Sequence, residues 1–176
     1  LRVVFFGLFT PLQGTSVIAE ALRLQPDLDL ECTLIGRGQE LATVRSLLAS
    51  DSRVTWHDWI DAGSLPRLVA AHDVCLGIFG SAPKALRVVP NKVFQGAAAG
   101  CAVVTSDTPP QRRALGPAAR YVPPGDAMAL AEVLAELATN PSELEALRAA
   151  AAERADTAFT PDAVIEPLVI CLENLR

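Results

Sequence analysis

The residues best suited to bind an anion begin in the segment FFGLFTPLQGTS. Gly7, Thr10, Gln13 and Gly14 lie here between an apolar run and a stretch with helical spacing. Glycine adopts backbone conformations that other residues resist, and the free amides at the start of a helix favour a negative charge. The segment differs from the GxGxxG dinucleotide motif, which argues against NAD. A phosphate-binding loop and a plain strand–helix turn both fit these residues.

The segment VVPNKVFQGAAAGCAVVTSDTP carries a second candidate. Pro90 and Asn91 begin a helix, and Asn91 is expected to be its cap. Lys92 lies in the first turn, where a cation opposes the helix dipole unless an anion sits at that end. The chain has only two lysines, Lys84 and Lys92, and they flank the preceding loop. We expect Lys92 to bind phosphate and Gln95, one turn on, to reach a sugar hydroxyl; a solvated lysine and a surface glutamine are the alternative.

Two further segments offer groups for a nucleoside. LIGRGQEL runs from an apolar stretch into Gly36, Arg37 and Gly38, where the glycines permit close approach of a ribose or phosphate. Helix packing is the alternative explanation for these glycines. Trp59, which precedes Ile60, offers an aromatic face for a nucleobase, whereas core packing is the expected role of Trp56.

Alternating strands and helices must position these groups. Such alternation predicts an α/β domain with a Rossmann-like, doubly wound parallel sheet of about six strands, which binds ligands beyond the carboxyl ends of the strands. We expect helices on both faces and the C-terminal helices packed on one side. The expected strands are residues 1–6, 30–35, 54–56, 74–79, 102–106 and 120–122. The expected helices are residues 15–24, 39–49, 65–71, 91–99, 109–115, 126–139, 142–156 and 162–175.

The composition indicates one globular domain over residues 1–176. A net charge of −5 argues against nucleic acid as a partner. The cysteines lie among apolar residues and are expected to be buried thiols in a reducing compartment: Cys32, Cys75, Cys101 and Cys171. The sequence shows no secretory signal and no apolar run of membrane-spanning length, which favours the cytoplasm. The chain opens on LRVVFF without a methionine, so we expect an N-terminal portion to be missing.

Several segments, in this order, resemble the retaining, nucleotide-sugar-dependent glycosyltransferases of the GT-B fold (glycosyl transferases group 1). The segments are FFGLFTPLQG, LIGRGQEL, VTWHDWI, LPRLVAAHDVCL, PNKVFQGAAAGCAVVTSDTP, VPPGDAMALAEVLAEL and FTPDAV. The resemblance implies the C-terminal half of such an enzyme, which binds a UDP- or GDP-sugar donor. It also implies that the N-terminal acceptor domain is absent from this chain.

The resemblance also implies roles for individual residues. An arginine and a lysine of the family's first loop correspond to Leu8 and Gln13, and its two donor-binding glutamates correspond to Arg87 and Gln95. Lys92, helped by Arg87, is expected to take over part of the phosphate binding. The expected donor-binding residues are Gly7, Thr10, Gln13, Gly14, Gly36, Arg37, Gly38, Trp59, Ile60, Arg87, Pro90, Asn91, Lys92 and Gln95.

The resemblance places the catalytic histidine in the other half, so no catalytic residue is expected here, and neither His57 nor His72 is assigned a role. It implies metal-independent chemistry without a cofactor, in carbohydrate biosynthesis. It implies a cytoplasmic protein, with peripheral association at the inner face of a membrane as an option for the full-length chain, and an inactive fragment on its own. Two alternatives stay open: a non-catalytic binding or assembly domain, favoured by the missing charges, and half of a sugar-nucleotide epimerase.

Overall fold

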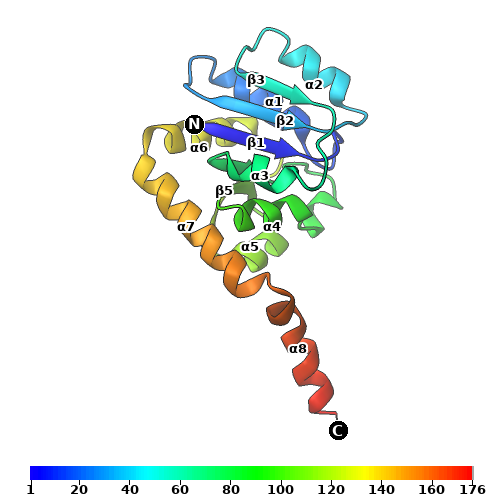
Figure 1. Ribbon diagram of the computed structural model, residues 1–176. Coiled ribbons are helices and arrows are strands. Elements are labelled where there is room, and N and C mark those ends of the chain that lie inside the picture. The colour runs from blue at the N-terminus through cyan, green and yellow to red at the C-terminus, as the bar shows by residue number, and fades with distance from the viewer. Residues whose placement is uncertain (176) are drawn as a thin grey trace.

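The computed structural model describes residues 1–175. Within them, six strands form one sheet in which every neighbouring pair of strands is parallel (Figure 1). Its strand order, β3-β2-β1-β4-β5-β6, is that of a doubly wound sheet, which confirms the predicted fold class. The strands are β1 (Arg2–Phe6), β2 (Glu31–Ile35), β3 (Val54–His57), β4 (Val74–Leu76), β5 (Ala102–Ser106) and β6 (Ala119–Val122).

The central strands form because their apolar residues are buried on both faces of the sheet. In β1 every residue after Arg2 is buried, and in β5 all five residues are buried. Such continuous apolar runs are typical of parallel strands covered by helices on both sides. The register aligns Phe6 with Ile35 and Ile35 with His57, so the loops that follow β1, β2 and β3 leave the sheet at one edge.

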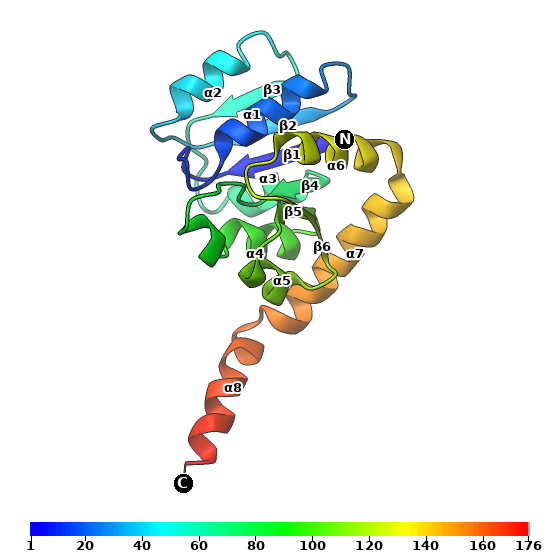
Figure 2. The ribbon, with the colours of Figure 1, turned by 180° about the vertical axis from the view of Figure 1, so that it is seen from behind.

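Helices cover both faces of the sheet (Figure 2). The helices α1 (Thr15–Leu24), α2 (Leu41–Leu47) and α6 (Ala127–Thr139) share one apolar core with Val3 and Phe5 of β1. On the other face, α3 (Leu65–Ala70) packs with Val4 and Phe6, while α4 (Asn91–Ala98) and α5 (Pro109–Leu115) pack with Val103 of β5. Within residues 1–175, no helix is long and apolar enough to cross a lipid bilayer.

Apart from shifts of one or two residues at several ends, such as those of α2 (Leu41–Leu47), some details differ from the expected elements. β4 ends at Leu76 instead of residue 79, and a short 3₁₀ helix, η1 (Ala85–Arg87), interrupts the loop before α4. The residue that caps α4 is Pro90 rather than Asn91, and no side chain bonds to the first amides of this helix. Cys171 is exposed, unlike the other three cysteines, because α8 (Pro161–Glu173) packs on neither face of the sheet.

The prediction that the C-terminal helices pack on one side of the sheet is wrong. α7 (Pro141–Ala158) passes from one core to the other: Leu144 packs against the core of α1 and α6, and Ala151 and Ala155 belong to the core of α4 and α5. α8 buries no residue and projects from the end of α7 (Figures 1 and 2). Helical spacing predicted these helices, but it carries no information about the surface that each one meets.

Removal of residues 161–176 is expected to leave the stability of the domain unchanged. Because α8 buries none of its residues, its loss exposes almost no new apolar surface. The truncated chain, ending at Thr160, should melt within about 2 °C of the full chain, since about 1 kcal/mol shifts the melting temperature by roughly 2–4 °C at this size.

The control for this truncation also removes Phe159. The Phe159 ring meets the Phe94 ring edge to face, with 4.8 Å between the ring centroids. Such pairs contribute about 0.5–1.5 kcal/mol beyond the apolar area that they bury. A chain that ends at Ala158 should therefore melt several degrees lower, as measured by circular dichroism. Equal melting temperatures for the two truncations would contradict this account of the C-terminal packing.

Candidate functional site

The loops that follow β1 and β2 pack directly on each other. The Gly7 amide donates to the Ile35 carbonyl at 2.9 Å, and the Phe9 amide donates to the Arg37 carbonyl at 2.9 Å. A Cβ atom at Gly36 would overlap the Gly7 carbonyl, and one at Gly38 would overlap the Phe9 backbone. Packing between two loops, rather than the approach of a ligand, is therefore a sufficient reason for both glycines.

Gly14 has a similar structural reason. It precedes α1 with a φ of 69°, and a Cβ there would lie 2.5 Å from the backbone carbon of Phe79, beyond the end of β4. The Thr10 carbonyl accepts from the amide of Gly14 and so closes the turn. At the first residue of α1, the Thr15 hydroxyl donates to the Glu40 carboxylate at 2.7 Å. Because a carboxylate already faces the start of α1, this helix end is a poor place for a second anion.

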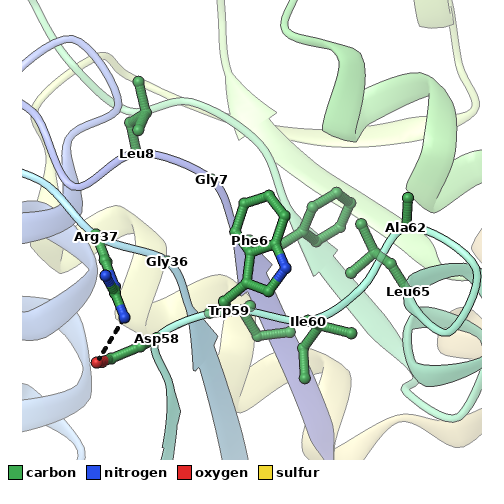
Figure 3. Close-up of a pocket in the computed structure, with 11 residues that line it drawn as sticks. Phe6, Gly7, Leu8, Gly36, Arg37, Asp58, Trp59, Ile60, Ala62 and Leu65 are labelled. Carbon is green, nitrogen blue, oxygen red and sulfur yellow. Dashed lines mark hydrogen bonds and ion pairs between the residues drawn. The ribbon is translucent and has the colours of Figure 1, made fainter.

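A cavity of about 360 Å³ opens where the loops after β1, β2 and β3 meet. Figure 3 shows Gly7 and Leu8 along one side of it and Trp59 and Ile60 along the other. Trp59 is 78% exposed although it is a large aromatic residue. An apolar cavity of this volume with few polar groups suits a flat aromatic ring. The full lining is Phe6, Gly7, Leu8, Ile35, Gly36, Arg37, Asp58, Trp59, Ile60, Ala62 and Leu65.

Asp58 supplies the acidic group of this cavity, although it belongs to none of the expected donor-binding residues. Its carboxylate accepts from Arg37 at 3.4 Å, which Figure 3 shows at one end of the cavity, and from Arg45 at 2.9 Å. The guanidinium of Arg45 also lies over the ring of Trp56, at 5.2 Å from its centroid. Trp56 packs against Phe9 and the core, as expected. The only signal in the sequence was the place of Asp58, between a strand and an exposed tryptophan.

Lys92 is buried, which excludes a solvated lysine. Its side chain is 5% exposed, and its Nζ donates to the Oε1 of Gln13 at 2.6 Å. Nζ also lies 3.7 Å from the centroid of the Phe5 ring. Burial lowers the pKa of Lys92 from its ordinary value of 10.5 to about 7. A Cβ at Gly7 would lie 3.1 Å from Nζ, so this amine sits directly behind a residue that lines the cavity.

The remaining expected residues lie outside this cavity. Arg87 is exposed on η1, and Asn91 is exposed at the start of α4. Gln95 lines a second cavity of about 420 Å³, between α3 and α4, which shares the side chains of Phe6 and Leu65 with the first. The structure thus brings together one group, Gly7, Gly36, Arg37, Trp59 and Ile60, with Gln13 and Lys92 behind it. It places Thr10, Gly14 and Gly38 in loop packing, and Pro90 at the cap of α4.

His72, Cys32 and Cys75 lie in buried or half-buried structural surroundings. The ring of His72 lies within hydrogen-bond distance of the Leu68 carbonyl and the Thr33 hydroxyl, at 2.8 and 2.9 Å. Burial raises the pKa of the Cys32 thiol to about 12 and also raises the pKa of Cys75. Such thiols are unreactive because the thiolate is the nucleophile. These residues therefore hold the fold and supply no chemistry to the cavity.

A doubly wound parallel sheet with an apolar cavity at the carboxyl ends of its strands defines a Rossmann-like domain. Residues 1–140 match the family described as glycosyl transferases group 1, and the chain belongs to that family. No curated protein matches the chain as a relative.

Solved structures of several glycosyltransferases share the fold. The Anabaena protein HepE, in complex with UDP and glucose, matches with a TM-score of 0.79 and 18% identity, over 98% of this chain and 48% of that one. Sucrose-phosphate synthase of Thermosynechococcus elongatus has a TM-score of 0.80 and 19% identity, over 99% and 45%. The catalytic domain of cholesterol-alpha-glucosyltransferase from Helicobacter pylori has a TM-score of 0.74 and 15% identity, over 88% and 96%. The chain thus spans about half the length of the first two proteins.

Proposed function

We propose that this domain binds the nucleoside diphosphate of a UDP- or GDP-sugar and forms the donor half of a glycosyltransferase. The cavity beside Trp59 carries this proposal, because it joins an exposed aromatic face to the Gly7 backbone, behind which the amine of Lys92 lies. The HepE structure, which has the same fold, holds UDP and glucose, and this supports the class of ligand.

The base occupies the apolar cavity and stacks on Trp59. The ribose lies toward Gly36 and Arg37, and the diphosphate lies along the Gly7 backbone toward the first turn of α4. No side chain caps the start of this eight-residue helix, and the Val93 amide donates to the Pro90 carbonyl, which leaves the amides of Asn91 and Lys92 for phosphate oxygens. Lys92 lies in the same turn and supplies a charge-assisted hydrogen bond. Positively polarised groups then stabilise the leaving diphosphate during transfer without a metal ion or a cofactor.

The acceptor site and the catalytic groups belong, on this proposal, to an N-terminal domain of the same protein. Seven exposed apolar residues lie on or just beyond α8, and they support a partner domain that packs on this helix. Soluble proteins rarely leave so large an apolar surface in contact with water. They are Val164, Ile165, Leu168, Val169, Ile170, Leu172 and Leu175. The chain alone then transfers no sugar. We place the full protein in carbohydrate biosynthesis in the cytoplasm, with peripheral association at the inner membrane face as an option.

The first test is nucleotide binding without metal. UDP or GDP at about 100 times its dissociation constant should add roughly 2.7 kcal/mol to the free energy of unfolding. For a domain of this size, that corresponds to an increase of roughly 5–10 °C in melting temperature. The measurement is a thermal-shift titration with UDP, GDP and ADP in the presence of a chelator. A shift that requires Mg²⁺ would contradict the metal-independent site, and no shift with any nucleotide would favour a non-catalytic assembly domain.

A further inference from the structure

The amine of Lys92 is held in the ligand-free domain by a neutral partner. Its one hydrogen-bond acceptor among the described residues is the side-chain amide of Gln13, at 2.6 Å. The Phe5 ring covers it on one side and the Gly7 backbone on another. An ammonium ion in such a place loses most of its hydration and gains in return one neutral acceptor and the face of the Phe5 ring, which together replace only part of the lost hydration. This environment therefore favours the neutral amine over the charged form.

None of the elements packed around Lys92 brings a carboxylate to its amine in the described chain. β1 and its loop contribute Phe5, Gly7 and Gln13, none of which ionises. β4 contributes the Cys75 thiol, which is neutral because burial raises its pKa. Burial outweighs the effect of this thiol, and together they place the pKa of Lys92 at about 7.

Two acidic residues in the loops that follow β2 and β3 are engaged elsewhere. Asp58 accepts from Arg37 and Arg45, and Glu40 accepts from the Thr15 hydroxyl. Leu8 and Gln13, in the loop against which Lys92 packs, carry no charge. A bound diphosphate would therefore be the first anion to face the amine. Its charge would favour the ammonium form, since an opposite charge within about 4–6 Å stabilises the ionised state.

We propose that Lys92 is neutral in the ligand-free site and takes up a proton when a nucleoside diphosphate binds. This inference rests on the proposed function. The proton comes from solvent and converts the Nζ amine to an ammonium group, which then donates to a phosphate oxygen. No covalent bond to the ligand forms or breaks. At pH 8 and above, the site thus carries its cation almost only when the ligand is present, and donor binding becomes dependent on pH.

The proton uptake that accompanies nucleotide binding is measurable above pH 7.5. With a ligand-free pKa near 7, binding at pH 8 should take up about 0.9 proton per site. The dissociation constant of UDP or GDP should then rise about tenfold for each pH unit between pH 8 and 9. The phosphates do not account for this change, because the second ionisation of a phosphate monoester lies near pH 6 and is complete by pH 8. A nucleoside without phosphate should bind with no proton uptake.

Calorimetry in two buffers of different ionisation enthalpy, at pH 8, measures the uptake directly. The wild-type chain should take up nearly one proton with UDP or GDP, whereas Lys92→Met should take up none and bind more weakly. Lys84→Met, at the exposed second lysine, is the matched control and should behave as wild type. Binding without uptake, or equal uptake by Lys92→Met, would overturn the inference but leave the proposed function standing. No binding of either nucleotide would overturn both.

A second measurement keeps the inference testable even if Lys92→Met fails to fold. The chain has two lysines, so NMR of the lysine side-chain carbons gives two titrations, and Lys84→Arg identifies which one belongs to Lys92. We expect the Lys92 signal to titrate near pH 7 without ligand and to stay in its charged form through pH 8 with UDP or GDP bound. A ligand-free titration near pH 10.5 would overturn the inference, whatever the nucleotides do.

Discussion

Replacing Trp59 with alanine is expected to weaken the binding of UDP or GDP by about 1–3 kcal/mol, or roughly 5- to 150-fold, the usual range for a base stacked on an aromatic side chain. Trp59 is 78% exposed at the mouth of the cavity, so packing within the domain gives little reason for an indole at this position. The nucleoside without phosphate should lose affinity by the same factor, because stacking acts on the base alone.

Two control variants separate stacking from apolar contact in this cavity. Trp59→Phe keeps an aromatic face and should recover most of the affinity. Leu8→Ala removes an exposed apolar side chain from the opposite side of the cavity without removing an aromatic face, and it should have a small effect. Calorimetry on the three variants gives the comparison. Equal losses for Trp59→Ala and Leu8→Ala, or no loss for either, would show that the base binds elsewhere.

Gly36→Ala is expected to lower the free energy of unfolding by at least about 2 kcal/mol, because backbone strain and overpacking act together. Gly36 has a φ of 135°, which side chains rarely allow, and its Cβ would overlap the Gly7 carbonyl. Relief of this overlap requires the β1 and β2 loops to separate. Nucleotide affinity should therefore fall together with stability, because the Gly7 and Gly36 backbones both line the cavity.

Gly100→Ala is the matched control for this substitution. Gly100 follows α4 with a φ of 78°, but a Cβ there would meet nothing within 4 Å. This variant therefore carries only the cost of the left-handed backbone, about 1–2 kcal/mol. Urea unfolding followed by tryptophan fluorescence measures both values. Equal losses would mean that the contact between the two loops contributes nothing to the stability of the domain.

Most of the sheet could be predicted from the sequence. Continuous apolar runs such as VVFF and AVV, each followed by glycine or polar residues, indicate buried parallel strands. The strand ends at Phe6, Ile35 and Ser106 were placed correctly because a change in composition marks each one. The strand expected over residues 74–79 is longer than β4, which ends at Leu76. Ile78 and Phe79 lie beyond the strand, but they are buried and apolar like strand residues, so the sequence does not distinguish them.

The sequence alone determined that this chain forms a doubly wound α/β domain with its loops at one edge, because the periodicity of apolar residues is a local property. Only the tertiary structure decided that Gly36 and Gly38 serve loop packing, that Asp58 joins the cavity, and that α8 leaves the domain. These outcomes depend on which surfaces meet across large separations in the chain. The same holds for Lys92: its place in the first turn of α4 was readable, but its burial against Phe5 and Gln13, which governs its charge, was not.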